Sequence, residues 1–253
     1  MSCLSRPLLF VLLALGSTAR AAEQADLPGW TLTFQDEFNS TALDTRKWMP
    51  RDPFERERNH ELQAYVTNAF KVKDGVLSII ADKGEAFYDG KQRAYTSGMM
   101  NTRGKFSQQY GRFEIRCRVP RGKGLWPAFW LLPVAGGWPR EIDVLEFLGQ
   151  NTARVHMAHH FPHEKHGSHE GSWSGPDFAA DFHQFAIEWS PQAIVWYVDG
   201  VERFRSEKSV PHEEMYLMVN LAVGGDWPGA PNEWTRFPAA FAVDYVRVYR
   251  RAE

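Results

Sequence analysis

The amino-acid sequence predicts an all-β fold, an antiparallel β-sandwich with a groove on one concave face. Short segments rich in β-branched and aromatic residues follow one another along the chain, separated by turn residues. Asp74-Gly75 and Asp199-Gly200 lie where tight hairpin turns would join two such segments. Hardly any segment has helical periodicity. No repeat, linker or low-complexity block divides the chain, so we expect one domain whose groove suits an extended polymer.

Eleven segments have the composition and alternation of strands. In chain order they are 31–34, 69–73, 76–81, 111–119, 125–132, 141–148, 154–161, 183–189, 193–198, 215–223 and 241–250. In the segment 111–119, Phe113, Ile115 and Cys117 alternate with charged residues, which predicts one buried face. We therefore expect Cys117 to be a small buried hydrophobic residue and not a reactive thiol.

The N-terminal residues 1–21 have the features of a signal peptide. Arg6 precedes an apolar run over 7–15, and Ala19-Arg20-Ala21 forms a small-x-small cleavage site. The apolar run is too short to span a membrane, and no later segment qualifies. We therefore expect a secreted protein, extracellular or periplasmic, with no membrane partner after cleavage and a mature chain over 22–253.

Composition narrows the range of partners. Removing 21 of the 253 residues leaves 232, enough for one large β-sandwich with a full core. Cys3 leaves with the signal peptide, so Cys117 is alone and cannot form an internal disulfide. The formal net charge of −2 gives no electrostatic reason to expect nucleic acid or an anionic membrane as partner. We expect a monomer.

The most informative segment is Glu141-Ile142-Asp143-Val144-Leu145-Glu146, in which three carboxylates are interleaved with aliphatic residues. On a strand, Glu141 and Asp143 point to one face, whereas Glu146, at an odd offset, would point to the other. A β-bulge at Val144-Leu145 would return Glu146 to the face of the other two acids. Such a cluster is costly unless it is used, because like charges raise one another's pKa.

The spacing of the two glutamates can be compared with what glycoside hydrolysis needs. Five residues of bulged strand span roughly 13 Å, and two side chains leaning together leave about 5 Å between the carboxyl groups. That separation is typical of a retaining glycosidase, which uses one acid as nucleophile and the other as general acid/base. The alternatives are a solvated strand face paired with arginine or lysine, a structural calcium site, and edge charges that prevent aggregation.

Three tryptophans, Trp126, Trp130 and Trp138, precede the acids. Sugar rings present apolar C–H faces that lie flat on indoles, and tryptophan is amphipathic enough for a wet site. Trp126 and Trp130 are four residues apart, so they share one face of an unbroken strand. If Leu131 faces the core, both indoles face the groove that holds the acids; otherwise they are packing residues.

The segments GLWPAFWLLP, over 124–133, and EIDVLEFLG, over 141–149, resemble the laminarinase-like β-glucanases of glycoside hydrolase family 16, which have a jelly-roll fold. Further segments with the same resemblance are 30–39, 43–48, 61–65, 74–77, 95–98, 110–114, 182–189, 196–200, 220–229 and 243–249. The resemblance covers nearly all of the chain after residue 29. It implies that residues 22–253 form a single glycoside hydrolase catalytic domain.

The resemblance also implies specific roles. Glu141 matches the nucleophile of the family, and Glu146 matches the acid/base. Asp143 matches the residue that hydrogen-bonds the nucleophile and helps to set the protonation of the group. No cofactor is required for this chemistry.

Six of the nine histidines lie between His156 and His169. No pair among them has the context of a zinc finger, so we expect no native metal there. The resemblance places His160 beside the catalytic groove, and His156 shares its strand face. We expect His160 and Asn59 to bind substrate together with the three tryptophans. The remaining histidines are expected to be solvated residues of a loop.

A structural calcium ion near the junction of the chain ends is often present in the family. The residues that match its ligand regions are Glu37, the backbone of Gly75, and Asp244. Oxygen ligands suit calcium. The alternative for the two carboxylates is ordinary hydrogen bonding to amides at strand ends.

Three departures from the family pattern border the expected groove. Trp138-Pro139 is followed by Arg140 alone before the first glutamate, which shortens that loop. Ser97-Gly98-Met99 stands where many members have Ser-Gly-Arg, and the loop 162–176 is rich in histidine. These departures affect the assignment of the substrate and leave the three acids untouched.

Three functions remain open from the sequence. The first is a retaining endo-β-1,3-glucanase, with mixed β-1,3/1,4-glucan as a further substrate. The second is the same chemistry on a galactan such as agarose or carrageenan; carrageenan would require clustered arginine or lysine for its sulfate groups, which the sequence does not place. The third is a noncatalytic carbohydrate-binding jelly roll, against which the three intact acids argue. A polysaccharide is the partner in all three.

Overall fold

The computed structural model describes residues 27–163 and 166–252, where the regular structure consists of the strands β1 to β16 in two sheets. A ten-stranded sheet has the order β14 (Val201–Ser206), β13 (Ile194–Val198), β12 (His183–Trp189), β7 (Gly111–Arg118), β16 (Ala239–Arg251), β4 (Val76–Tyr88), β5 (Lys91–Ser97) and β2 (Gln63–Tyr65), with β1 (Trp30–Asp36) on β16 and β3 (Phe70–Lys73) on β4. A six-stranded sheet has the order β11 (Gly167–Ser174), β10 (Arg154–Phe161), β9 (Glu141–Phe147), β8 (Leu125–Pro133), β15 (Met215–Val223) and β6 (Met99–Asn101). The predicted all-β sandwich is confirmed.

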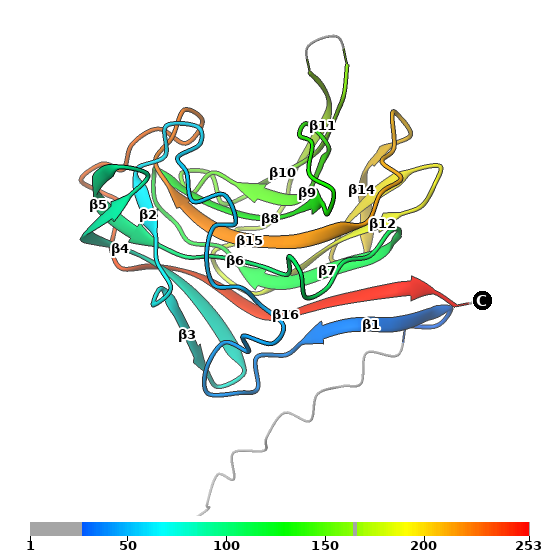
Figure 1. The fold of residues 1–253 in the computed structure, drawn as a ribbon, viewed down its shortest axis with the longest axis horizontal. Helices are drawn as coiled ribbons and strands as arrows, with labels where there is room; N and C mark the ends of the chain where they lie inside the picture. The colour runs from blue at the N-terminus through cyan, green and yellow to red at the C-terminus, as the bar shows by residue number, and fades with distance from the viewer. Residues whose placement is uncertain (1–26, 164–165, 253) are drawn as a thin grey trace, which may run out of the picture.

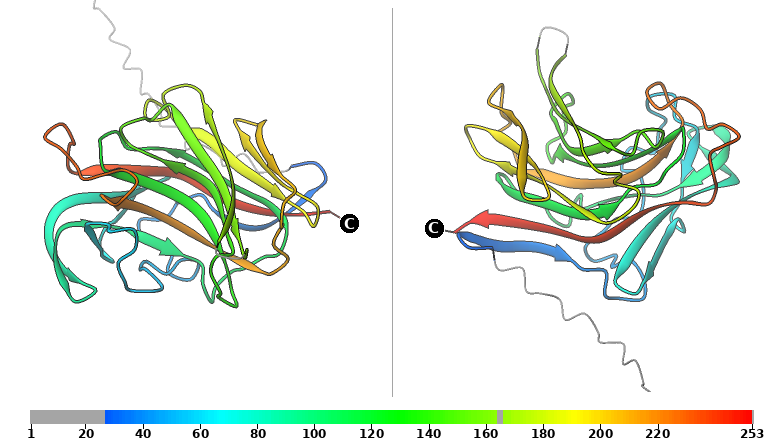
Figure 2. Two further views of the ribbon diagram at one scale, coloured as in Figure 1. Left: turned by 90° about the horizontal axis from the view of Figure 1, so that it is seen from above. Right: turned by 180° about the vertical axis from the view of Figure 1, so that it is seen from behind.

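The two sheets lie one above the other, with β15, β8, β9 and β10 in one layer and β7, β16 and β1 in the other (Figure 1). The described strand pairs are antiparallel except β2 with β5, which is parallel. β9 pairs with β8 on one side and with β10 on the other. Figure 2 shows the same ribbon from above and from behind. Side chains on the outer face of β9 are therefore held by two neighbours at fixed register.

A continuous apolar core fills the space between the sheets. Its largest fully buried side chains include Trp48, Trp196, Phe129 and Phe147. Burying a side chain of this size stabilises the fold by about 1.5–3 kcal/mol. Cys117 is fully buried, as expected, and burial raises the pKa of its thiol well above the ordinary value. Its low reactivity stays a prediction.

The predicted hairpin turns are confirmed by backbone geometry. Asp74 and Gly75 have φ of 53° and 74° between β3 and β4, and Asp199 and Gly200 have φ of 49° and 76° between β13 and β14. Two successive residues with positive φ are the signature of the turn that matches the twist of a two-stranded hairpin.

All eleven predicted strands are present, with ends that shift by a few residues. Strands that the sequence did not predict are β2, β5, β6, β11 and β14. The expectation of a loop over 162–176 is wrong, because Gly167–Ser174 forms β11 and pairs with β10 along its whole length. β11 was not predicted because its sequence is mostly polar. An edge strand with one face open to solvent needs few apolar residues. Within the described ranges, no helix is long and apolar enough to cross a membrane.

Candidate active site

A β-bulge sets the direction of the three acids on β9. Toward β10, Ala158 pairs with Asp143 and His156 pairs with Glu146, so three steps along β9 face two steps along β10. The register toward β8 shifts at the same place. The bulge predicted at Val144-Leu145 is confirmed, and it returns Glu146 to the face that carries the other acids.

Glu141, Asp143 and Glu146 line one groove of about 740 Å³ on the outer face of the six-stranded sheet. On the opposite face of β9, Ile142 and Leu145 are fully buried between the sheets. The strand therefore separates an apolar core face from an acidic groove face. The predicted groove and its acidic lining are both present.

The acids are held in surroundings that favour their protonated forms. Burial raises the pKa of Glu141 well above the ordinary value, and the carboxyl groups of Asp143 and Glu146 raise it further. Burial and Asp143 likewise raise the pKa of Glu146, against the hydrogen bond that Trp126 Nε1 donates to Glu146 Oε1 at 2.9 Å. Both glutamates keep part of their surface open to the groove, so a substrate can reach them.

His160 lies beside the middle acid. Its Nε2 is 3.1 Å from Asp143 Oδ2, although that oxygen is out of line with the N–H and has no aligned hydrogen bond. Burial lowers the pKa of His160, but Asp143 and Glu170 more than offset this and raise it above the ordinary value. The other ring nitrogen is 2.9 Å from His166 Nε2, and His166 packs against Trp138 with 4.7 Å between ring centroids. The structure therefore places His160 in the groove, as expected.

The other histidines differ from the prediction of solvated loop residues. His159 is fully buried with Nε2 2.9 Å from Ser206 Oγ, and His169 Nδ1 is 2.6 Å from the same hydroxyl. Burial, with the nearby rings of His169 and His160, lowers the pKa of His159 to about 4. His166 reaches the groove, and only His163 is exposed as expected without a described contact. The prediction fails because β11 extends the sheet and brings these side chains against β14.

All three predicted tryptophans line the groove. Trp130 Nε1 donates to Asn220 Oδ1 at 2.7 Å, and Leu131 next to it is fully buried, as the alternation required. Trp138 is 62% exposed, so most of its indole is open to a ligand. The three indoles lie where a sugar chain in the groove could reach them. Their contact with sugar stays a prediction.

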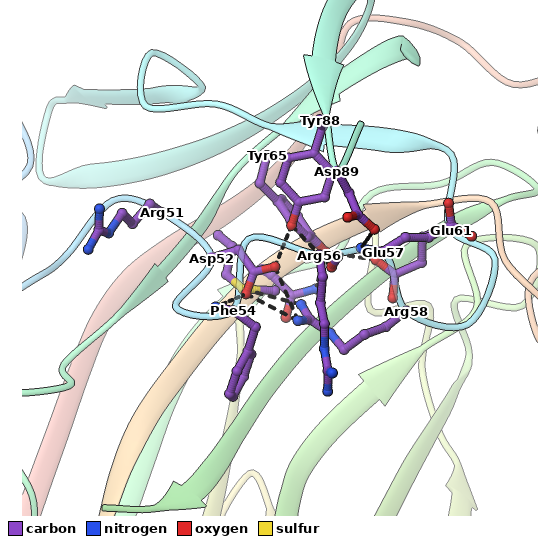
Figure 3. Close-up of polar contacts among 12 residues, drawn as sticks. Arg51, Asp52, Phe54, Arg56, Glu57, Arg58, Glu61, Tyr65, Tyr88 and Asp89 are labelled. Carbon is purple, nitrogen blue, oxygen red and sulfur yellow. Dashed lines mark hydrogen bonds and ion pairs between the residues drawn. The ribbon is translucent and has the colours of Figure 1, made fainter. Parts of the chain in front are cut away.

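Sequence reasoning missed the part of the groove built by the segment 52–61. Asn59, which was expected, lines the groove there together with Arg58. Arg58 Nη1 lies 3.1 Å from both carboxylate oxygens of Asp52, which is 1% exposed, and the Tyr88 hydroxyl also donates to Asp52. Figure 3 shows Arg58 and Tyr88 both directed at this carboxylate. In the sequence, the charged residues 55–58 have the composition of a solvated loop. Only the tertiary fold reveals the pair of Arg58 with the buried Asp52.

The residues assigned to calcium do not form an open ligand set. Both Glu37 oxygens accept hydrogen bonds from Arg247, at 2.7 and 2.9 Å, and Arg116 donates to Asp244. Gly75 belongs to the hairpin turn described above. A calcium ion would have to displace an arginine from each carboxylate, so the donors as arranged do not fit it, and calcium stays a prediction.

A second group has the geometry of metal ligands. Glu141, Asp143 and His160 each offer one ligand atom, and these atoms lie within 4.8 Å of one another. Two carboxylates and an imidazole suit several divalent transition metals. Glycoside hydrolysis requires the carboxyl groups of Glu141 and Asp143 to be free of metal. A metal ion bound here would therefore compete with that reaction.

The comparisons with known proteins agree with the site. The model of the family "Glycosyl hydrolases family 16" matches residues 57–247. The chain belongs to this family. It is therefore a glycoside hydrolase.

Two curated relatives and one solved structure illustrate the similarity. A beta-glucanase of Rhodothermus marinus is 39% identical over 268 residues, which cover 94% of this chain and 92% of the relative. The endo-1,3-1,4-beta-glycanase EglC of Rhizobium meliloti is 36% identical over 87% of this chain, which spans about half (51%) of that relative. The catalytic domain of an endo-1,3-beta-glucanase (laminarinase) from Thermotoga petrophila is 36% identical, with a TM-score of 0.83 and coverage of 88% of this chain and 99% of that one.

Proposed function

We propose that the protein is a retaining endo-β-glucanase that cuts internal β-1,3 linkages, and mixed β-1,3/1,4 linkages, of glucans. The observation that carries the proposal is the cluster of three acids on the bulged strand β9, in a groove, with no lysine or arginine ion pair to any of them among residues 27–163 and 166–252. Carboxyl groups in such surroundings hold protons at a pH where ordinary carboxylates have lost them. Two such groups on one face are what a double displacement requires.

The roles follow from position and environment. Glu141 attacks the anomeric carbon as its carboxylate while Glu146 donates a proton to the leaving oxygen. Glu146 then takes a proton from water, which attacks the same carbon from the side of the departed sugar and releases Glu141 with retained configuration. Asp143, next to both glutamates, shifts their proton affinity and so keeps Glu146 protonated in the first step.

The side chains around the acids support a polymeric substrate. Trp126 holds Glu146 through its N–H while its ring lines the groove, so it connects sugar binding to the acid/base. Trp130 and Trp138 add further apolar surface for sugar C–H faces. Asn59 and His160 supply polar atoms for hydroxyl groups. The names of the relatives supply the glucan assignment.

We also propose that the protein is secreted. The sequence features of a signal peptide over 1–21 support this, and these residues lie outside the part that the structure describes. An extracellular or periplasmic enzyme meets polymers too large to enter the cell. N-terminal sequencing of the protein recovered from culture medium or periplasm tests the cleavage site after Ala21.

A substrate screen tests the function. Purified protein is incubated with laminarin, lichenan, agarose and carrageenan, and reducing ends and product sizes are measured. We expect release of oligosaccharides from laminarin, slower release from lichenan, and none from the galactans. Cleavage of agarose or carrageenan without cleavage of laminarin transfers the assignment to galactans. Binding to any of the four polymers without cleavage indicates a noncatalytic carbohydrate-binding module.

A further inference from the structure

The groove end next to Glu141 is lined by three arginines, Arg56, Arg58 and Arg103. They come from two segments far apart in sequence, one before β2 and one after β6. Arg58 Nη2 lies 3.8 Å from Met99 Sδ on β6, and Arg103 lies two residues beyond the end of that strand. Burial and Glu141 raise the pKa of Tyr216, which lies on β15, the strand that pairs with β6, whereas both arginines lower it.

Arg58 is the fixed member of the group. Both Asp52 oxygens bind its Nη1 at 3.1 Å, and Tyr88 and the Phe54 backbone N–H also donate to Asp52. The Arg58 guanidinium lies 5.3 Å from the centroid of the Phe54 ring, and that of Arg56 lies 5.9 Å from it. Figure 3 shows Phe54 and Arg56 pointing the same way, away from Asp52. The buried pair thus anchors a loop that presents Arg56 toward the groove.

Arg56 and Arg103 differ from the neighbouring arginines in having no anionic partner. In the part of the chain that the structure describes, neither side chain has an ion pair or a hydrogen bond to an acid, and both are exposed. Nearby, Arg51 is paired with Glu55 and Arg93 with Glu57. Two guanidinium groups are therefore available to a ligand at this end of the groove.

An acid lines the groove at the other edge of the sheet. Glu170 on β11 lies in register with Ala158 on β10, which pairs with Asp143. It raises the pKa of both Glu146 and His160. β11 and β6 are the two edge strands of the six-stranded sheet, so Glu170 and Arg103, which follows β6, lie at opposite edges. A neutral glucan gains nothing from this difference in charge, whereas a chain with an anionic group near the arginines is oriented by it.

We propose that Arg56 and Arg103, next to Arg58, form a subsite for an anionic substituent, a carboxylate or sulfate, on the sugar chain at the Glu141 end of the groove. This rests on the proposed function and narrows its substrate class to β-glucans that carry acidic groups. The planar guanidinium binds both oxyanions through paired N–H donors. Because both arginines are exposed, each contributes about 1.4- to 5-fold in kcat/KM at low salt.

The experiment compares three polymers of matched length: laminarin, laminarin partly oxidised at C6 to carboxylate, and laminarin partly sulfated. The readout is the ratio of kcat/KM on each anionic polymer to that on laminarin, at low and at high salt. We expect the native enzyme to prefer at least one anionic polymer by about 2- to 30-fold, with the preference lost at high salt. The preferred polymer tells carboxylate from sulfate.

The variant Arg56→Ala/Arg103→Ala is expected to bring this ratio close to one. The matched control Arg118→Ala/Arg250→Ala removes two exposed arginines from strands of the ten-stranded sheet and should keep both the activity and the ratio. A native ratio near one, or a double variant that keeps the native ratio, overturns the subsite.

Binding provides a readout that does not depend on glucan cleavage. Glu141→Gln protein is run through native gels that contain each polymer. Retardation by an anionic polymer that Arg56→Ala/Arg103→Ala abolishes supports the subsite even if laminarin is not cleaved, in which case the proposed function alone fails. Equal retardation with and without the two arginines overturns the subsite while the proposed function stands.

Discussion

Buried acids occur on both sheets of this protein, and their surroundings differ. On the ten-stranded sheet, Glu114 accepts two hydrogen bonds from Arg112, at 2.9 and 2.8 Å, and one from the Tyr245 hydroxyl at 2.8 Å. On the six-stranded sheet, Glu141 and Glu146 have another carboxyl group as neighbour and no arginine or lysine ion pair within the described ranges. In both cases the acid is a glutamate on a β-strand, and only its neighbours differ.

This difference in neighbours separates a structural acid from an acid that can take part in a reaction. A carboxylate that is buried with an arginine is neutralised, and removing one partner leaves the other charge unpaired. Carboxyl groups that are buried together raise one another's pKa, which costs stability but keeps a proton ready for transfer. The partner of a buried acid, and not its burial, separates a structural carboxylate from a candidate for proton transfer.

The largest expected effect comes from Glu141→Gln. An amide cannot attack the anomeric carbon, so hydrolysis of laminarin should fall by at least about 10³-fold while oligosaccharide binding persists. Reducing-end release and isothermal calorimetry measure the two quantities. Glu114→Gln is the control, since an acid held by Arg112 should keep catalysis in the fraction that remains folded. Substantial activity in Glu141→Gln would place the nucleophile elsewhere.

Glu146→Ala separates the two glutamates of the groove. Glucan cleavage should fall by about 10²- to 10⁴-fold because the leaving oxygen receives no proton. Aryl glycosides with good leaving groups need no proton and should be cleaved still. Added azide should restore turnover by taking the place of water, with a retained anomeric configuration in the product. An inverted product by NMR contradicts the double displacement.

Stability should respond in opposite directions on the two sheets. Glu114→Gln leaves the buried Arg112 without its closest acid and should cost about 3 kcal/mol of unfolding free energy. Glu141→Gln removes a charge that its neighbours disfavour and should stabilise the protein at neutral pH. Chemical denaturation of both variants and the native protein measures the difference, and a loss of stability in both contradicts the comparison.

The pH dependence of that stability has a definite sign. The folded-state pKa values of Glu141 and Glu146 are raised, so their favourable contribution is present below the ordinary glutamate pKa of about 4.3 and is lost as pH rises through the raised values. The stability gained by Glu141→Gln should therefore grow from acid toward neutral pH. Melting curves of native and variant protein across this range measure it.

Trp126→Phe probes the connection between sugar binding and the acid/base. Loss of indole surface and of the hydrogen bond to Glu146 should weaken binding by roughly 1–3 kcal/mol, about 5- to 150-fold. Without that bond the pKa of Glu146 rises further, so the basic limb of the pH–rate profile should move upward. Trp48→Phe, in the core and bonded to Asp36, should lower the melting temperature and leave the Michaelis constant nearly unchanged.

The smallest expected effect is that of chelation. Glu37 and Asp244 are already paired with Arg247 and Arg116, so EDTA should shift the melting temperature by less than about 2 °C. A drop of several degrees that calcium alone restores would show that the ion displaces the arginines. Arg247→Ala is the complementary variant, because it frees Glu37 and should destabilise the protein with or without the chelator.

Several features were predictable because they depend on neighbours along the chain. Alternation on a strand has a period of two, so the odd offset of Glu146 from Glu141 required a bulge, and the structure has it at Val144-Leu145. The same rule placed Trp126 and Trp130 in the groove once Leu131 faced the core. The family resemblance added the roles that the residues alone left open.

Other features were not predictable because their partners lie far apart in sequence. Arg58 with Asp52 looks like a charged loop, and burial of the pair depends on Tyr88, which lies on β4. His159 and His169 looked solvated, but both contact Ser206 on β14. Polar residues have no fixed periodicity to reveal such contacts, since a charge is buried only when the fold brings its partner.

The sequence by itself therefore determined the all-β class, the bulge and the face on which the three acids of β9 lie, because hydrophobic alternation encodes these locally. Only the tertiary structure decided which acids have an arginine partner, that β11 extends the six-stranded sheet, and that Arg56, Arg58 and Arg103 line one groove. These depend on the electrostatic pairing of side chains across strands, and the pairing of distant strands is set by the packing of the whole core.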